Sequence, residues 1–408
     1  MMPTSRDIRA RNRRLLLQHI VAQPAVSRPA LAAATGLSHA TVGTLAAELL
    51  DLGLVAESGY EESAGGRPRA LLTAAGADGR LIGVDVAETY VHAELFDLSL
   101  AVRASAAAPL HPGDLTPDTV VDRIAAAVDA ALARGGAEPG SVLGAGVSMP
   151  GQVDRPGSDH ATIGYAANWA WQDVPLTARL AARLPYPVHL DNPLRACTAA
   201  ELWFGAARGR NDAVVLNLGT GVGAGLAVGG EVYRGSTNSA GEWGHTTLVL
   251  DGRRCHCGAR GCVEAYIGAA GIMRTLRERA PRSLLLSPSD QTATIAALGR
   301  AAAAGDKAAN DVLAETARYL GAATADLVNL LNPEVVVLSS WVAAALGEPL
   351  LHKLRPEVRA RALPRPGAAV ELALSPVPSN PVSLGAAAFA LEGALAPAAP
   401  KSRRGTRS

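Results

Sequence analysis

Three of the four cysteines in this 408-residue chain, Cys255, Cys257 and Cys262, fall within one short segment. His245 lies upstream of them. Thiolates with one imidazole are a common closed ligand set for Zn²⁺, which takes four ligands in a tetrahedron. Glycines inside the segment allow one tight loop to wrap the thiolates around an ion. The sequence therefore predicts a structural Cys3His zinc site in the loop 245–262.

Two other interpretations of the segment stay open. His256 is a rival ligand, although its position between two ligating cysteines strains its approach to the same ion. The thiols can also be reduced cysteines with no metal. A disulfide is less expected, because nothing in the chain marks it for export.

Two carboxylates, Glu242 and Glu264, bracket this segment. A metal loop does not require them. Ionised carboxylates accept hydrogen bonds from the neighbouring hydroxyl groups of a polyhydroxylated ligand. The pattern suggests a sugar pocket whose wall is held in place by the zinc loop.

At this point the stretch resembles the ROK family of repressors and sugar kinases, whose hallmark is E-x-G-H followed by C-x-C-G-x-x-G-C-x-E. The resemblance implies an α/β fold of the actin-like (ribonuclease H-like) type, duplicated as in sugar kinases. It implies that the zinc ligands are His245, Cys255, Cys257 and Cys262. The hexose hydroxyls would then contact Glu242, His245 and Glu264.

Composition indicates a globular protein of two or three domains, since 49% of the residues are apolar and the formal net charge is +1. No stretch reaches the roughly 20 apolar residues of a membrane span, and no signal peptide is apparent. We expect a cytoplasmic protein without a membrane partner. The first thirty residues carry six arginines against one aspartate, which favours a polyanionic partner there.

The amino-terminal segment has the pattern of a helix-turn-helix. Apolar residues at helical spacing predict a first helix from about 11 to 23, ended by Pro24. Ser27 is expected to cap a second short helix, and a third runs from Ser38 or His39 to about residue 52. A glycine-containing turn between the second and third helices matches this motif. The alternative is a small helical domain that binds another protein.

Two short strands, 54–57 and 70–73, are expected around a polar loop, which makes residues 1–76 a winged helix-turn-helix domain that binds operator DNA. In the loop, Arg67 and Arg69 suit the negative potential of a narrow minor groove. The exposed polar side chains of the third helix suit base edges or phosphates. These are Ser38, His39, Thr41 and Thr44. Regulators of the family that this chain resembles carry the same module ahead of the sugar domain.

Beyond a small-residue linker, alternating strands and helices predict a two-lobed sugar domain over residues 77–395. A last helix from about 383 to 395 is expected to complete the first lobe, and 396–408 to be a disordered basic tail. The main predicted strands are 81–86, 90–96, 101–107, 142–148, 187–190, 214–218 and 334–338. The main predicted helices are 117–133, 194–207 and 308–331.

Two asparagines are further candidates for the sugar site. Asn168, followed by Trp169, resembles the pair that closes over the hexose in the family, and its amide offers both a donor and an acceptor. A plain turn asparagine is the alternative. Asn192 is also available to the sugar by resemblance.

Several positions that serve phosphoryl transfer in the family's kinases have changed. Pro193 stands where those kinases carry the aspartate that is the general base, and proline has no proton acceptor. In the first turn, Ala87 and Glu88 stand where those kinases carry two glycines whose backbone amides would approach a phosphate, and Glu88 would repel it. The bulky Trp341 follows the strand after which kinases have a glycine pair. A loop resembling the second phosphate-binding turn remains, although such a loop also simply packs two strands closely. It consists of Gly219, Thr220, Gly221 and Gly223.

Together these patterns favour a sugar-responsive transcriptional regulator, a repressor without enzymatic activity, over an enzyme. By resemblance it is a homodimer or homotetramer, which fits palindromic operators. One alternative is an active ATP-dependent sugar kinase with a DNA-binding appendage. Another is a DNA-bound protein whose pocket is vestigial or takes a sugar phosphate.

Overall fold

The computed structural model describes residues 4–61, 68–76, 79–111, 113, 115–154, 161–166, 169–287, 290–378 and 380–395. The chain divides into two compact units, which are described separately. The first unit comprises Met1–Asp191 and Val382–Ser408, and the second comprises Asn192–Pro381. Arg67, Asn168 and the predicted tail 396–408 lie outside the described residues.

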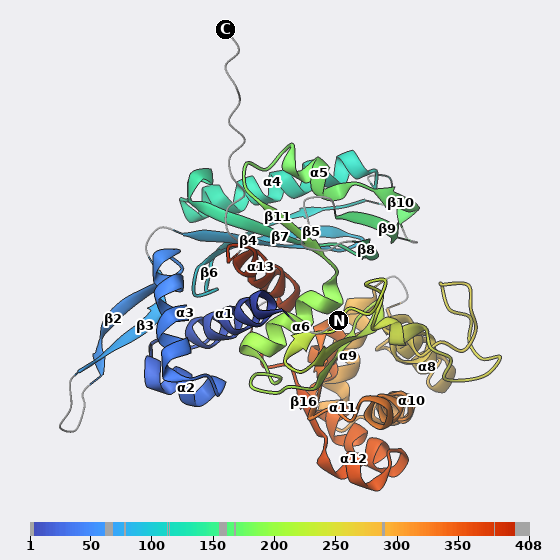
Figure 1. Ribbon diagram of the computed structural model, residues 1–408. Helices are drawn as coiled ribbons and strands as arrows, with labels where there is room; N and C mark the ends of the chain where they lie inside the picture. The colour runs from blue at the N-terminus through green and yellow to red at the C-terminus, as the bar shows by residue number, and fades with distance from the viewer. Residues whose placement is uncertain are drawn as a thin grey trace. The chain divides into compact units, whose positions relative to one another are not determined.

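The first unit begins with three helices and a β-hairpin (Figure 1). The helices are α1 (Ser5–Val21), α2 (Arg28–Thr35) and α3 (His39–Asp51). Strand β1 (Val26–Ser27) pairs with β3 (Arg69–Ala74), which pairs in turn with β2 (Val55–Glu61). Leucines from all three helices form the core, including Leu16, Leu31 and Leu49. The three helices and two strands of a winged helix-turn-helix are therefore present.

The first helix starts earlier than the hydrophobic pattern predicts. Thr4 caps it, accepting a hydrogen bond from the Asp7 N–H while the Asp7 side chain accepts one from the Thr4 N–H. Ser27 occupies the N-cap position of α2 as predicted, but its side chain makes no capping hydrogen bond. Pro29, with its preset φ, lies in the first turn of that helix.

The rest of the first unit is built on a five-stranded mixed sheet in the order β11-β7-β4-β5-β6. Its strands are β4 (Arg80–Val86), β5 (Tyr90–Asp97), β6 (Val102–Pro109), β7 (Val142–Ser148) and β11 (Val188–Asp191). Figure 1 shows helices α4 (Pro117–Gly135) and α5 (Leu176–Ala181) over one face of the sheet and helix α13 (Pro381–Gly393) on the other. A three-stranded sheet that the sequence did not predict adjoins them. It comprises β8 (Gln152–Asp154), β9 (Thr162–Ala166) and β10 (Trp171–Val174).

Helix α13 touches this sheet backbone to backbone. A Cβ placed on Gly146 of β7 would lie 1.8 Å from the carbonyl oxygen of Ala386. One placed on Gly83 of β4 would lie 2.0 Å from the carbonyl oxygen of Ser383. The Ser383 hydroxyl also donates a hydrogen bond to the buried Glu94 carboxylate of β5. At these two glycines the backbone of the helix lies directly against the backbones of β4 and β7.

The second unit repeats the same sheet topology, β14-β13-β12-β15-β16. In each sheet the strand that comes first in the sequence, β4 or β12, lies in the centre. On one side it pairs with the second strand, which pairs with the third, and both pairings are antiparallel. On the other side it pairs with the fourth strand, which pairs with the fifth, and both pairings are parallel, so the α/β fold is duplicated. The strands are β12 (Ala213–Leu218), β13 (Val222–Val228), β14 (Glu231–Val232), β15 (Val335–Ser339) and β16 (Glu371–Leu374).

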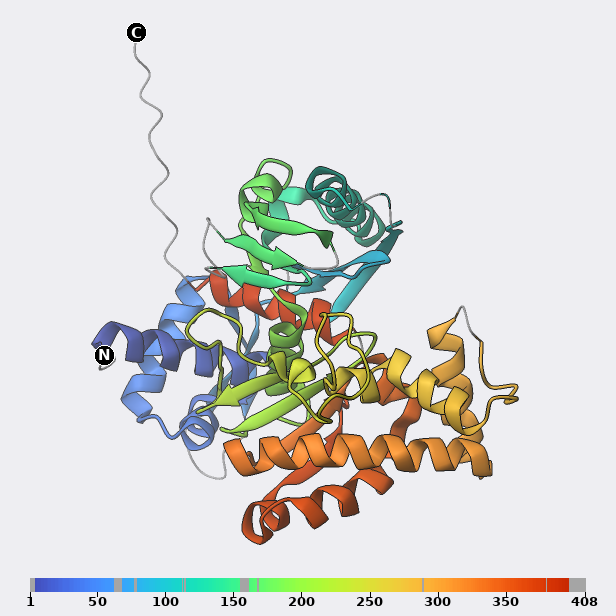
Figure 2. The same cartoon turned by 90° about the vertical axis from the view of Figure 1, so that its right-hand side faces the viewer.

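Helices of the second unit cover its sheet and bury a large apolar core. They are α6 (Pro193–Phe204), α7 (Glu264–Ile267), α8 (Ala269–Arg279), α9 (Gln291–Ala303), α10 (Lys307–Leu331), α11 (Ser340–Arg361) and α12 (Pro364–Ala369). Figure 2 shows the long α10 running beside α11. Among the described helices, none combines the length and the hydropathy that crossing a membrane requires.

Candidate functional site

Four predicted ligands gather in the second unit. One ligand atom from each of His245, Cys255, Cys257 and Cys262 lies within 4.8 Å of the others. The sulfurs of Cys257 and Cys262 are 3.8 Å apart, and the Cys255 sulfur is 3.7 Å from Nδ1 of His245. Metal–sulfur bonds of about 2.3 Å at the tetrahedral angle place two sulfurs about 3.8 Å apart. All three cysteines are free thiols, so the cluster fits a four-coordinate metal ion.

Two glycines shape the loop that carries these thiols. Gly258 has φ +93° and lies inside the turn that the Cys255 N–H closes by donating to the Ala259 carbonyl at 2.9 Å. Gly261 has φ +77°, and a Cβ on it would lie 1.8 Å from the Val249 carbonyl oxygen. Larger residues could adopt neither position without strain. The predicted tight loop is therefore confirmed.

The environment of the thiols differs along the loop. Burial raises the pKa of Cys255 and of Cys262 above that of an ordinary thiol. Burial also opposes ionisation of Cys257, but hydrogen bonds from the Ala259 N–H and the other two thiols bring its pKa below the ordinary value. Because metals bind thiolates, a metal ion entering this cluster would displace the thiol protons.

Glu264 contacts both the loop 245–262, called the metal loop below, and the glycine-rich turn formed by Gly219, Thr220, Gly221 and Gly223. Its carboxylate is buried, with 6% of the residue exposed. One oxygen accepts a hydrogen bond from the Cys255 thiol at 3.4 Å and lies 2.9 Å from Nδ1 of His256. The other oxygen accepts from the Val222 N–H at 3.0 Å. His245, His256 and Glu264 form a second group that could hold a metal, so His256 stays a candidate.

The glycine-rich turn lies beside Trp341. The Gly219 N–H donates to the Gly221 carbonyl at 3.1 Å, which closes the turn. A Cβ on Gly219 would lie 3.2 Å from the indole nitrogen of Trp341. Ser340 holds φ +77°, a conformation that favours glycine. Of the other predicted loop residues, Thr220 is exposed and Gly223 is buried.

Two other residues predicted to contact the sugar, Glu242 and Asn192, lie in different surroundings. Glu242 is exposed at the start of a short 3-10 helix, η3 (Glu242–His245). Asn192 is buried, and its side-chain oxygen accepts a hydrogen bond from the Arg195 N–H at 3.1 Å, which caps α6. Pro193 follows as the first residue of α6, as expected from its fixed φ.

Asn168 lies outside the described residues, but its neighbour Trp169 is buried. The Trp169 ring packs edge-on against Trp171 with centroids 5.1 Å apart. Within the described part of the chain, the buried indole nitrogen of Trp169 has no hydrogen-bond partner. A buried donor of this kind suits a ligand that brings an acceptor.

On α3, Ser38, His39 and Thr44 are exposed and Thr41 is half-buried. The Ser38 hydroxyl caps the helix by accepting from the Thr41 N–H at 3.1 Å. Arg69 on the hairpin is exposed. These positions present a polar helix face and one basic strand residue to solvent.

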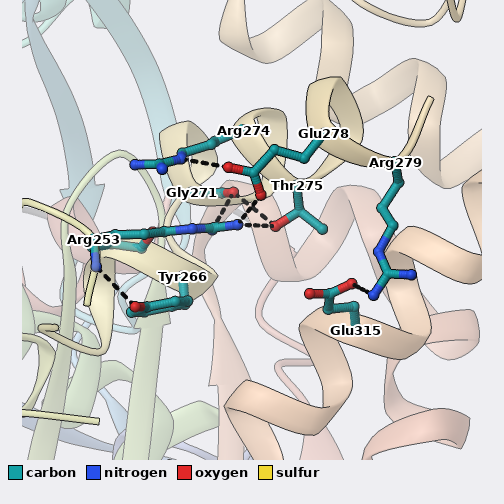
Figure 3. Close-up of polar contacts among 9 residues, drawn as sticks. Arg253, Tyr266, Gly271, Arg274, Thr275, Glu278, Arg279 and Glu315 are labelled. Carbon is teal, nitrogen blue, oxygen red and sulfur yellow. Dashed lines mark hydrogen bonds and ion pairs between the residues drawn. The ribbon is translucent and has the colours of Figure 1, made fainter. Parts of the chain in front are cut away.

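Arg253 forms hydrogen bonds from the metal loop to α8 (Figure 3). The sequence did not predict this role. The Arg253 guanidinium, 9% exposed, donates to the carbonyls of Ala265 and Gly271 at 3.3 and 3.1 Å. It also donates to the Thr275 hydroxyl at 3.1 Å and to the Glu278 carboxylate at 2.8 Å. The only signal in the sequence is an arginine two residues before the first ligating cysteine.

Replacing Arg253 by alanine is expected to destabilise the second unit by about 2 kcal/mol, because buried carbonyls and a carboxylate lose a charged donor. Arg274 is the matched control, since it binds the same Glu278 at 2.7 Å but is 50% exposed. Arg274→Ala should cost about 0.5 kcal/mol or less. Urea denaturation of both variants measures the difference. Equal losses would show that the Arg253 network contributes no more than a surface ion pair.

Comparison with known proteins gives consistent matches. The model of the ROK family matches residues 81–392. A xylose repressor from Caldicellulosiruptor bescii is 28% identical over 94% of this chain and 96% of its own length. A glucokinase from Halalkalibacterium halodurans is 34% identical over 60% of this chain and 75% of its own length. The crystal structure of a ROK family transcriptional regulator, a homologue of the E. coli MLC protein, has TM-score 0.76 and 24% identity over 95% of this chain and 98% of that one.

Proposed function

Because this chain belongs to the ROK family, we propose that it is a sugar-responsive transcriptional repressor. Residues 1–76 would bind operator DNA and residues 77–395 a hexose-like effector. The observation that carries the proposal is the reach of the similarity to the xylose repressor. At 94% of the chain, it extends over the helix-turn-helix as well as the duplicated α/β fold.

The DNA-binding surface would be the exposed face of α3 with the hairpin beside it. His39 and Thr44 would reach base edges, since both are exposed. Ser38 and Thr41 would contact phosphates, as helix N-termini commonly do. Arg69, and Arg67 by its position in the sequence, would enter the minor groove.

The effector would bind Glu242, His245 and Glu264, together with Asn192 of the same unit. Asn168 remains a candidate from the sequence alone. Zn²⁺ is the metal that the Cys3His set suits best, and with four protein ligands it would have a structural role. The ion would hold His245 and the start of α7 in place, and Glu264 is the first residue of α7. Although both oxygens of Glu264 already accept hydrogen bonds, a carboxylate has lone pairs for a sugar hydroxyl as well.

Phosphoryl transfer would be absent from this protein. Pro193 offers no proton acceptor where the resemblance expects a general base. The indole of Trp341 lies against the glycine-rich turn, so a side chain occupies the space beside Gly219 where a nucleotide would otherwise lie. The similarity to a glucokinase is the observation on the side of the alternative, an active kinase with a DNA-binding appendage. Incubation with ATP, Mg²⁺ and sugars separates the two, because a kinase accumulates sugar phosphate.

The repressor would act as a homodimer or homotetramer. Two-fold symmetry in the protein matches two half-sites of a palindromic operator. The distance between the two operator half-sites would then equal the distance between the α3 helices of the two subunits.

The proposal is tested in two steps with wild-type protein. Thermal shift with a panel including D-xylose and D-glucose should show at least one sugar that raises the melting temperature, since a ligand of the folded state stabilises it. Selection from a random-sequence DNA library should then recover a palindromic operator whose affinity changes with that sugar. Failure to enrich any sequence, or rapid formation of sugar phosphate, would contradict the repressor assignment.

A further inference from the structure

One arginine of α1 contacts both α3 and the chain segment that follows α13. Nη2 of Arg13 donates to the carbonyl oxygen of Leu395 at 2.6 Å. Nη1 of the same side chain is 3.4 Å from a carboxylate oxygen of Glu48 on α3. The side chain is mostly buried, with 21% exposed. A single planar guanidinium therefore bridges α3 and the carboxyl end of α13.

The position of this bridge suits a cation. Helix α13 ends at Gly393, and the Leu395 carbonyl lies just past its carboxyl terminus, where the partial charge of the helix dipole is negative. A neighbouring arginine, Arg14, lies 3.9 Å from Glu392 in the last turn of the helix. Arg9 pairs with Glu48 from the preceding turn of α1. Three arginines of the basic amino terminus therefore contact groups on α3 or at the carboxyl end of α13.

At its other end α13 is joined directly to the strands of the first unit. Gly83 and Gly146 bring the backbones of β4 and β7 against it, and Ser383 donates to Glu94. Strands β4, β7 and β11 run parallel and end at Val86, Ser148 and Asp191. Asn192, a proposed sugar contact, directly follows β11.

These contacts make α13 a stiff connection between the strands and α1. At Gly83 and Gly146 the backbones meet directly, so no side-chain rotamer there can absorb a shift of β4 or β7, and packed interiors transmit displacement. Any movement of α13 therefore changes the position of the Leu395 carbonyl. Arg13 contacts both this carbonyl and Glu48 on α3, so a shift of the carbonyl is passed to α3 through the Arg13 side chain.

We propose that Arg13 is the positioning residue through which sugar binding changes the operator affinity of α3. The inference rests on the proposed repressor function and specifies how its two activities are coupled. A ligand changes DNA affinity only by favouring one of two states that bind DNA differently. The Arg13 bridge gives those states a physical difference, namely whether α3 is held against the end of α13.

The experiment compares operator affinity with and without sugar in full-length protein. The DNA is the operator selected from a random library, and the sugars are D-xylose and D-glucose. In the wild type, the sugar that raises the melting temperature should change the dissociation constant for DNA by about 5- to 150-fold. In Arg13→Gln this factor should fall below about 3-fold, while sugar affinity measured by calorimetry without DNA stays unchanged. A merely structural role would instead weaken DNA binding equally in both conditions.

Arg6→Gln is the matched control, because it removes the same charge from the exposed first turn of α1. It should keep the wild-type factor. If Arg13→Gln binds no operator, Arg13→Lys replaces it, since lysine keeps a cation beside Glu48 but lacks the planar fork that reaches two partners. If the sugar changes the DNA dissociation constant of the Arg13 variant by the same factor as in the wild type, the inference is wrong. If no sugar of the thermal-shift panel stabilises the wild type, or if stabilisation comes without any change in DNA affinity, the proposed sugar response itself fails, and the inference that rests on it fails as well.

Discussion

Replacing Cys262 by serine is expected to reduce the metal content from about one ion per chain to near zero, because a closed tetrahedral site loses one of its four ligands. The residue is fully buried, and its sulfur lies 3.8 Å from that of Cys257. Binding free energies of structural zinc sites are about 10–16 kcal/mol, so the loop should lose its order. Sugar binding should then disappear, because Glu264 follows Cys262 by two residues. Elemental analysis and calorimetry against the stabilising sugar measure both effects.

Cys197→Ala is the control for loss of a buried thiol. Cys197 is buried in α6 and is not among the four clustered ligands, so this variant should keep its metal. The helix-turn-helix belongs to the first unit, and Cys262→Ser should still bind operator DNA. Metal-free protein that kept full sugar affinity would show that the ion does not order the ligand site.

Thr44→Glu is expected to weaken operator binding by about 100-fold or more, since close like charges cost several kcal/mol and each 1.4 kcal/mol is tenfold. Thr44 is exposed on α3, and its hydroxyl donates only to the Ala40 carbonyl at 3.1 Å. A carboxylate there would lie close to the negatively charged DNA without disturbing the core. Fluorescence anisotropy with the selected operator gives the affinities.

Thr292→Glu makes the same chemical change at an exposed position of α9 in the second unit. It should leave operator affinity unchanged, and both variants should keep the sugar-induced rise in melting temperature. An equal loss of DNA binding in the two variants would point to a general charge effect. Unchanged binding in Thr44→Glu would place the DNA contact elsewhere on the chain.

Local patterns predicted the elements around the site because their signals are short-range. Strand β7 was predicted at its observed bounds, since a continuous apolar run between polar residues leaves little choice. The metal cluster was predicted from ligand type and spacing alone. The start of α1 was missed by six residues, because its first turns carry no apolar face and form around the Thr4 cap. The strands β8–β10 were missed as well.

What the sequence could not supply were contacts between distant residues. Nothing local relates Arg13 to Leu395, or Arg253 to helix α8 beyond the metal loop. In the sequence Arg13 counts among the basic residues that favour a polyanionic partner, and Arg253 has no assigned role. The fold largely buries both side chains. The same holds for Glu264, whose pairing with the Val222 N–H requires the glycine-rich turn and the metal loop to meet. Tertiary structure alone makes these partners neighbours.

The bare contact of α13 with Gly83 and Gly146 limits how this protein can evolve. A core filled by side chains tolerates drift, because one residue can grow while its neighbour shrinks. Here no such exchange exists, since even a methyl group would meet a carbonyl oxygen. A saturation library at these two positions should retain glycine almost alone, whereas leucines elsewhere under the sheet should accept substitutes.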